Sequence, residues 1–133
     1  MIHLDTCALV DALTGPRRSA RALRAFIEQG ERISFSTLVL FEWLRGPRSP
    51  EELEAQEALF PAAGAAVFGE AEAALAAELY RAVRRPRGRE LDLAIAATAI
   101  LQEAEFWTLN PRDFSDIPRL RLATIPQPFH PGR

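Results

Sequence analysis

The sequence predicts a single-domain α/β fold, a three-layer α/β/α sandwich around a mostly parallel sheet of four to five strands. Two observations support this class. Short apolar segments typical of strands alternate with longer segments whose apolar residues recur at helical spacing. A chain of 133 residues also suffices for one hydrophobic core. We assign residues 1–126 to the domain and the proline-rich residues 127–133 to a loose C-terminal tail.

The first part of the domain is expected to alternate strands and helices. In order, the elements are a strand at 1–5, helices at about 6–13 and 17–29, a strand at 33–36 and a helix at 37–45. Gly15 and Pro16 separate the first two helices, and Gly30 ends the second. The helix at 37–45 is apolar on nearly every face, which predicts that it is buried.

A capping pattern marks the start of the next helix. Ser49 stands at the cap, Pro50 at the first helical position and Glu52 three residues after the cap. We expect this helix to extend to about residue 60. A third strand at 65–68 and a long helix at 69–85 follow.

The last third of the chain has the clearest pattern. Its expected elements are an alanine-rich helix at 90–104, a strand at 106–109, a loop or short helical turn at 111–118 and a final strand at 120–125. Ligands of parallel α/β sheets bind beyond the carboxyl ends of the strands. Asp5 and Asn110 fall at that edge, so the sequence predicts a functional site there.

Composition excludes several classes of protein. The formal net charge is −2, which does not advertise nucleic-acid binding by the molecule as a whole. Every basic residue is an arginine, so a Walker A phosphate loop or a lysine Schiff base is excluded. Cys7 is the single cysteine, which leaves no internal disulfide and makes the cytoplasm the expected compartment. The apolar stretches are too short to span a membrane.

Five arginines fall within nine residues near the end of the helix at 69–85. They are Arg81, Arg84, Arg85, Arg87 and Arg89. Two interpretations are open: a solvated helix end followed by a loop, or a patch that contacts phosphates.

Four acidic residues stand where a carboxylate is costly or conspicuous: Asp5, Glu42, Asp92 and Asp113. Each has an ordinary structural interpretation. Asp5 fits a helix cap, and Glu42 an ion pair with Arg45 one turn on. Asp92 fits the favourable charge at a helix start, and Asp113 a turn after Asn-Pro. Their positions at strand ends and on helices favour a shared site.

Four sequence blocks resemble the PIN domain, and specifically the toxin ribonucleases similar to VapC. The blocks are LDTCALV, FEWLRG, LDLAIAATAI and TLNPRDF, and the resemblance covers the chain from Ile2 to Ile125. It implies that the acidic quartet of the family, which is catalytic and binds metal, corresponds to Asp5, Glu42, Asp92 and Asp113. Thr6 and Asn110 match the polar residues that support this quartet. Asp116 competes with Asp113 for the fourth position.

The resemblance implies metal-dependent hydrolysis of RNA phosphodiester bonds by an endoribonuclease, the toxin of a toxin–antitoxin pair. Carboxylates about 4 Å apart repel by about 4 kcal/mol at an effective dielectric near 20, so such a cluster requires a cation or stored protons. Oxygen ligands favour Mg²⁺, with Mn²⁺ as a substitute, whereas His3, His130 and Cys7 are too few for a zinc site.

The implied partners are an RNA substrate, a cognate antitoxin protein and a second copy of the chain in a homodimer. Candidate RNA contacts are the arginines at the end of the basic run: Arg84, Arg85, Arg87 and Arg89. Apolar faces such as Leu23, Phe26 and Ile27, or Leu53 and Phe60, are available for a partner, although core packing is favoured.

Two other functions remain open. One is a non-catalytic PIN-like module that binds RNA or a protein partner, in which the acids serve as caps and ion pairs. The other is a phosphatase or phosphotransferase that uses Asp5 as nucleophile. This second class needs an acid two residues on or a nearby lysine, and residue 7 is a cysteine.

Overall fold

The structure is a computed structural model that describes residues 1–16 and 18–126. Its elements are, in order, β1 (Ile2–Leu4), α1 (Thr6–Leu13), α2 (Arg18–Glu28), β2 (Ile33–Ser34), α3 (Thr37–Arg45), α4 (Pro50–Leu59), the 3₁₀ helix η1 (Ala62–Gly64), α5 (Glu70–Ala82), α6 (Glu90–Leu101), β3 (Glu105–Trp107) and the 3₁₀ helix η2 (Pro111–Phe114). The expected tail at 127–133 lies outside the described residues.

The sheet is parallel, with β1 between β2 and β3. Ile2 pairs with Ile33 on one side and with Glu105 on the other, and Leu4 pairs with Trp107. The strands share one direction, so their carboxyl ends lie at the same edge. Asp5 follows β1 at this edge, beside the residues that follow β3.

The strand number differs from the prediction. The described residues form three strands rather than four to five. At 65–68 there is a single bridge, Ser36 with Ala66, because Thr37 already begins α3 and leaves no further strand to pair with. At 120–125 the pairing is again one bridge, Phe106 with Leu122. Both predicted strands are therefore single-residue additions to the edges of the sheet.

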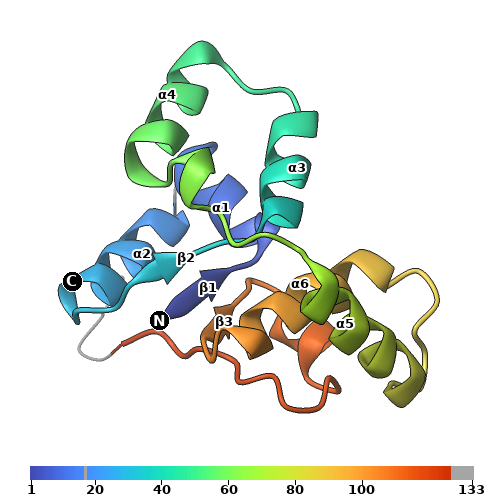
Figure 1. Cartoon of the computed structure of the whole chain (residues 1–133). Coiled ribbons are helices and arrows are strands. Elements are labelled where there is room, and N and C mark those ends of the chain that lie inside the picture. Colours follow the sequence, from blue (N-terminus) through green and yellow to red (C-terminus); the bar gives the residue numbers. More distant parts are fainter. Residues whose placement is uncertain (17, 127–133) are drawn as a thin grey trace.

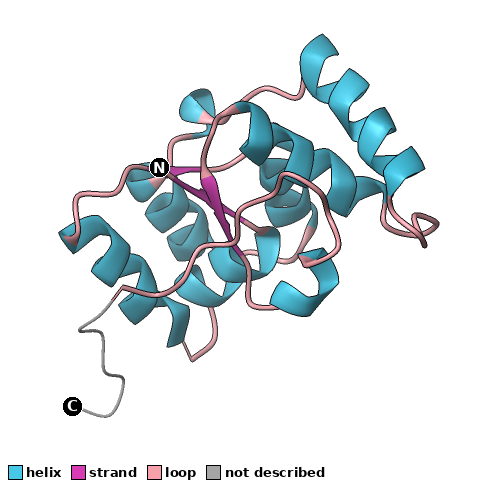
Figure 2. Ribbon diagram, turned by 90° about the horizontal axis from the view of Figure 1, so that it is seen from below, coloured by secondary structure: helices cyan, strands magenta, loops and turns pink. Residues whose placement is uncertain are grey.

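Helices cover both faces of the sheet (Figures 1 and 2). On one face Trp107 of β3 meets Phe26 of α2, with ring centroids 5.1 Å apart. On the other, the ring of His3 stacks on Phe106, and its Nδ1 is 2.7 Å from Oε1 of Gln102 at the end of α6. The predicted three-layer α/β/α class is confirmed.

Helix α6 forms the centre of the core. Its residues from Leu93 to Ala99 are all buried, and the alanines among them permit close packing against α5. Helix α4 begins as predicted, because the Ser49 and Glu52 side chains each accept a hydrogen bond from the other residue's amide. Leu23, Phe26 and Phe60 are core residues, as the favoured interpretation expected, whereas Ile27 and Leu53 are exposed and contradict it.

Helix α3 contradicts the prediction that it is buried on every face. Val39 and Trp43 are fully buried, whereas the side chains of Phe41 and Leu44 are 55% and 52% exposed. The helix stands at the edge of the domain with α4, so one of its faces has no layer to pack against (Figure 1). In the part of the chain described here, no helix combines the length and apolar character needed to cross a membrane.

Candidate active site

One open cavity of about 560 Å³ lies beyond the carboxyl ends of β1 and β3. All four acids singled out in the sequence line it, and each comes from a different segment: Asp5 after β1, Glu42 on α3, Asp92 on α6 and Asp113 on η2. Thr6 and Asn110 also line the cavity. The fold therefore brings together residues more than a hundred positions apart.

Asp5 is a buried carboxylate held by three donors. It caps α1, because its Oδ1 accepts a hydrogen bond from the Thr6 amide at 2.9 Å. Its Oδ2 accepts one from the Thr108 hydroxyl at 2.7 Å and lies 3.3 Å from the Cys7 thiol. These donors replace the water that the buried carboxylate has lost and fix its orientation.

Glu42 has partners on both carboxylate oxygens. The Thr6 hydroxyl donates to Oε1 at 2.5 Å, and the Arg45 guanidinium lies 3.2 Å from Oε2. The predicted ion pair with Arg45 is present, but Arg45 is largely exposed, so the pair is screened by water. Thr6 thus links the start of α1 to the acid on α3.

Asp92 carries the electrostatic cost of the cluster. Burial, followed by the charges of Asp5 and Glu42, raises the pKa of Asp92 from 3.8 to about 6. Asp113 adds to this effect and Arg89 opposes it. A carboxylate whose ionisation is resisted by three neighbouring acids is in a site with excess negative charge.

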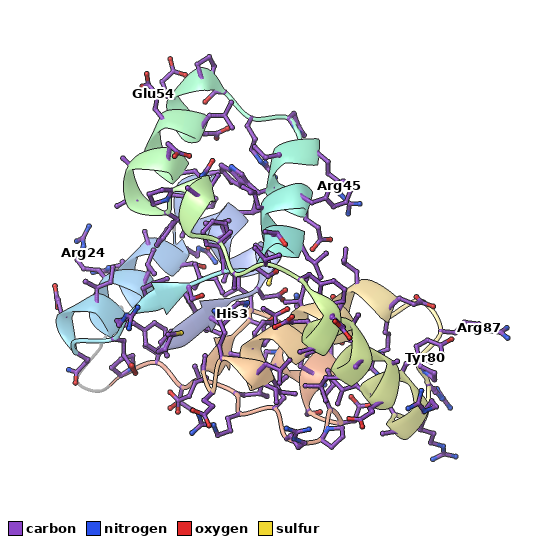
Figure 3. The ribbon with its side chains drawn as sticks, viewed as in Figure 1. His3, Arg24, Arg45, Glu54, Tyr80 and Arg87 are labelled. Atoms are coloured by element: carbon purple, nitrogen blue, oxygen red, sulfur yellow. The ribbon has the colours of Figure 1, made fainter. Side chains whose placement is uncertain are left out.

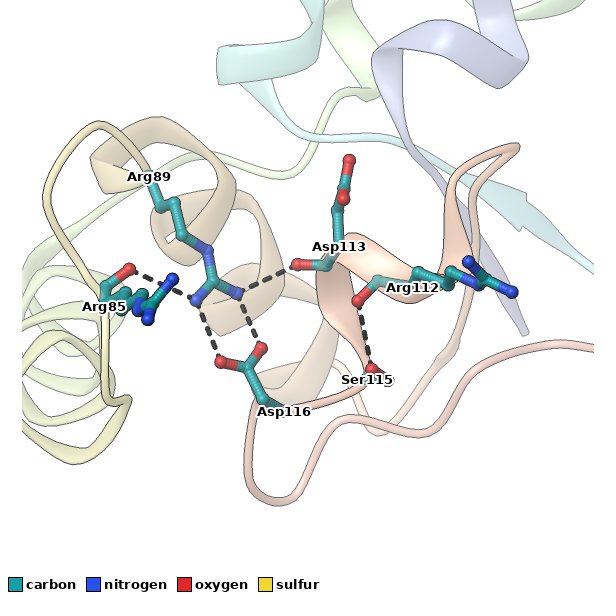
Figure 4. Close-up of polar contacts among 6 residues, drawn as sticks. All are labelled: Arg85, Arg89, Arg112, Asp113, Ser115 and Asp116. Atoms are coloured by element: carbon teal, nitrogen blue, oxygen red, sulfur yellow. Dashed lines mark hydrogen bonds and ion pairs between the residues drawn. The ribbon is translucent and has the colours of Figure 1, made fainter.

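The two candidates for the fourth acid have different surroundings (Figure 4). Asp113 lines the cavity with the other three acids. Asp116 is absent from the lining of this cavity and pairs with Arg89, whose two terminal nitrogens donate to its two oxygens at 2.9 and 2.7 Å. The geometry therefore favours Asp113.

Three polar residues at the site were not predicted from the sequence. Thr108 directly follows β3 and connects Asp5 to the loop there. Its hydroxyl donates to Asp5 and accepts a hydrogen bond from the Asn110 amide at 3.1 Å. Cys7 receives the Leu109 amide at 3.4 Å, and burial and the nearby Asp5 carboxylate raise the pKa of its thiol. Asp11 is a fifth acid on the cavity wall. The position of Thr108 at a strand end was a usable signal.

The arginine run divides into residues with different surroundings. Arg84, Arg85 and Arg89 line a second cavity of about 660 Å³, which shares Asp92 and Asp113 with the first. Arg87 projects away from the molecule from the loop after α5 (Figure 3). Helix α5 ends at Ala82, so Arg84 and Arg85 lie in this loop and not on the predicted helix.

The donor chemistry of the first cavity fits a hard divalent cation. The four acids present only oxygen atoms, and the raised pKa of Asp92 indicates negative charge that a cation would relieve. As the side chains lie, no three acidic, histidine or cysteine side chains among the described residues are close enough together to hold one metal ion. The cavity thus fits a divalent cation by the chemistry of its acidic side chains and by its location at the carboxyl ends of the strands.

The chain is similar to known proteins in sequence and in fold. The PIN domain family matches residues 2–120. Ribonuclease VapC19 of Mycobacterium tuberculosis is 40% identical over 120 residues, which cover 89% of this chain and 95% of the relative. DNA-bound VapBC from Salmonella typhimurium has a similar fold, with a TM-score of 0.76 and 20% identity over 92% of this chain and 96% of that one. FitAcB from Neisseria gonorrhoeae has a TM-score of 0.66 and 20% identity over 99% of both chains. The chain belongs to the PIN domain family.

Proposed function

We propose that this protein is a metal-dependent endoribonuclease and the toxin of a toxin–antitoxin pair. One observation carries the proposal: four carboxylates from four segments line one open cavity in a PIN domain that is 40% identical to a ribonuclease. Because all-oxygen sites favour hard cations, the cofactor is Mg²⁺, with Mn²⁺ as a substitute.

Asp5, Glu42 and Asp92 are the proposed metal ligands, and Asp113 completes the site. A divalent ion held by these residues would supply the charge that polarises the scissile phosphate and activates the attacking water. Thr108 and Thr6 orient Asp5 and Glu42 through hydrogen bonds of 2.7 and 2.5 Å. Such support commonly changes metal affinity or activity about 10- to 100-fold. Asn110, on the cavity wall, is placed to orient substrate or water.

Arg84 and Arg85 are the proposed contacts for RNA phosphates, because they line the cavity that adjoins Asp92 and Asp113. An RNA strand that crosses the four acids would contact Arg84 and Arg85 directly. Arg87 is exposed in the same loop and stays a predicted contact. Arg89 also stays a predicted contact, although its guanidinium is already bonded to Asp116.

A cognate antitoxin is the proposed protein partner, and the toxin is proposed to form a homodimer. A toxin–antitoxin complex from Klebsiella pneumoniae has a similar fold, with a TM-score of 0.69 and 23% identity. The exposed Phe41 and Leu44 on α3 and Leu59 on α4 offer apolar surface for such partners. A nuclease of cellular RNA acts where RNA is made and translated, so we place it in the cytoplasm.

Manganese soaked into crystals, located by its anomalous signal, tests the site without knowledge of the RNA target. We expect one peak coordinated by Asp5 and Asp92. Cleavage of total RNA with Mn²⁺, its loss with EDTA and its absence in Asp5→Asn test the reaction. An empty cavity at saturating manganese, with no cleavage, would favour the non-catalytic binding module instead.

A further inference from the structure

Arg89 has a fixed position at the start of α6. It directly precedes the helix and lies three residues before Asp92. The Arg89 amide donates to the Pro86 carbonyl at 2.9 Å, closing a turn in which Gly88 has a φ of +84°. This φ is in the left-handed region that favours glycine. The side chain of Arg89 therefore extends from a hydrogen-bonded turn at the start of α6.

The Arg89 guanidinium reaches the segment that carries Asp113. Its terminal nitrogens make the two bonds to Asp116, and Nη2 also donates to the main-chain carbonyl of Asp113 at 2.9 Å. Figure 4 shows the Asp113 carboxylate pointing away from Arg89 while its carbonyl accepts this bond. A planar guanidinium bonded in this way restrains both the distance and the angle of its partner.

Apolar contacts also hold the same segment. Phe114 packs on Phe106 with ring centroids 4.9 Å apart, and Ile117 is buried. These contacts secure the fold of the segment. Asp113 itself is exposed, so its placement depends on its own main-chain contacts, of which the Arg89 bond leads to α6.

The Arg89–Asp116 pair is poorly placed to stabilise the fold. Asp116 is 47% exposed and Arg89 22% exposed, and pairs so accessible to water contribute little to global stability. Their bonds nevertheless connect the start of α6, which carries Asp92, to η2, which carries Asp113. The pair therefore restrains geometry more than it adds stability.

We infer that Arg89 is a positioning residue: with Asp116 it clamps η2 to the start of α6 and so sets the placement of Asp113 relative to Asp92. The inference rests on the proposed function, in which both acids serve one metal site. It assigns Arg89 a role at the protein's own acids. An arginine whose donors are used in this way is less available to RNA phosphates.

A double-mutant cycle tests the clamp on the full chain. Arg89→Ala, Asp116→Ala and the double variant are compared for Mn²⁺ affinity by calorimetry without RNA, and for their melting temperatures. We expect each single variant to weaken Mn²⁺ binding about 10-fold. The double variant should be no weaker than the singles, because either change already breaks the clamp. Arg89→Lys, which keeps the charge but loses the fork, should recover only part of the affinity.

Hydrogen exchange gives a readout that needs no metal. The Ser115 and Ile117 amides donate within the clamped segment, to the Arg112 and Phe114 carbonyls. Asp116→Ala should speed exchange over 111–117 and leave α5 unchanged. Arg24→Ala and Glu54→Ala, at exposed positions on α2 and α4, are matched controls that should alter neither exchange nor Mn²⁺ affinity.

The outcomes separate the clamp from the proposed function. Unchanged exchange and affinity in Asp116→Ala would overturn the clamp, and so would additive losses in the double variant. A loss of RNA binding in Arg89→Ala with normal Mn²⁺ affinity would assign Arg89 to the substrate and overturn it as well. If the wild-type protein binds no Mn²⁺, the proposed metal site fails, and with it the positioning role, while exchange still reports whether η2 is clamped.

Discussion

Asp92 shares its cavity with four other acids, and burial, followed by the charges of Asp5, Glu42 and Asp113, raises its pKa. Compared with the unfolded state, the native state therefore favours the protonated form of Asp92. Stability from this group is fully present below its unfolded pKa of 3.8 and is lost as pH rises through about 6. At neutral pH the metal-free protein is thus destabilised by the site that its proposed function needs.

Asp92→Asn should stabilise the metal-free protein at pH 7. We expect a gain of about 1–2 kcal/mol after solvent screening of this half-buried group is included, vanishing by about pH 4. Thermal unfolding in EDTA across this pH range measures it, with the exposed Glu54→Gln as control. A loss of stability at pH 7 would instead support the binding module, in which Asp92 serves the helix start. Glu42→Gln is a less clean test because Thr6 and Arg45 both bond to Glu42.

Thr108→Val should weaken both the fold and the reaction. Valine has the shape of threonine but cannot donate to Asp5, so a buried carboxylate loses a hydrogen bond of 2.7 Å. We expect a loss of about 1–3 kcal/mol by urea unfolding and a drop of at least about 10-fold in RNA cleavage. Thr108→Ser, which keeps the hydroxyl, should restore most of the activity. Equal activity in the two variants would exclude the orienting role.

At the scale of single elements, β1 contains a buried histidine. The Nδ1 of His3 meets Gln102, but its Nε2 is buried with no partner among the described residues. Burial lowers the pKa of His3 from 6.5 to about 4, partly offset by the bond to Gln102. The native state thus holds His3 neutral. Its contribution to stability is complete above pH 6.5 and decreases as pH falls towards 4.

At pH 5 the His3 contribution should be lower than at pH 7 by about 2 kcal/mol. Asp92 acts in the opposite direction over part of this range, so the comparison is between wild type and His3→Phe, which removes the titrating group alone. Chemical denaturation at pH 5, 6 and 7 measures the difference between their free energies of unfolding. Parallel pH dependences for the two proteins would contradict the prediction.

Two adjacent residues of α3 test whether the helix is buried on one side only. Trp43→Ala removes a fully buried side chain beneath Arg48 and should cost about 3–5 kcal/mol. Leu44→Ala removes an exposed side chain and should stay within about 0.5 kcal/mol. Urea unfolding at two protein concentrations measures both. A large, concentration-dependent cost for Leu44→Ala would mean that a second copy already covers this face.

Local signals in the sequence predict some elements better than others. The cap at Ser49 and the alanine-rich α6 form as expected because the cap bonds and the close packing are set by nearby residues. The apolar composition of α3 does not show whether other layers cover both its faces. One face is uncovered, and Phe41 on it is exposed. Whether the segment at 65–68 extends as a strand depends on where α3 begins beside it, which composition does not specify.

At the scale of the whole molecule, the topology explains how much of the site was predictable. Parallel strands put Asp5 and the loop after β3 at one edge, and the family resemblance added Glu42 and Asp92. The hydrogen-bond partners of the acidic residues were not predictable from the sequence. The bond from Thr108 to Asp5 spans 103 positions, and the pairing of Arg89 with Asp116 requires the three-dimensional path of the chain.

Metal binding should stabilise the whole fold by mass action. At a Mn²⁺ concentration 100 times its Kd the gain is about 2.7 kcal/mol, or roughly 5–10 °C in melting temperature for a domain of this size. EDTA should reverse the shift, and Asp92→Asn should reduce it by at least half. Melting curves with and without Mn²⁺ test this, and an equal shift in the variant would indicate binding elsewhere.

The rate at which Cys7 is labelled can report whether the cavity is occupied. Cys7 lines the same cavity as the four acids, and it is the single cysteine of the chain. Alkylation by a mass-tagged maleimide therefore reports access to this one place, without interference from other thiols. Because the thiol pKa is raised, labelling is slow at neutral pH and is best followed in mild alkali. Any ion, oligonucleotide or partner that fills the cavity would slow this labelling, which makes ligand screening possible before the substrate is identified.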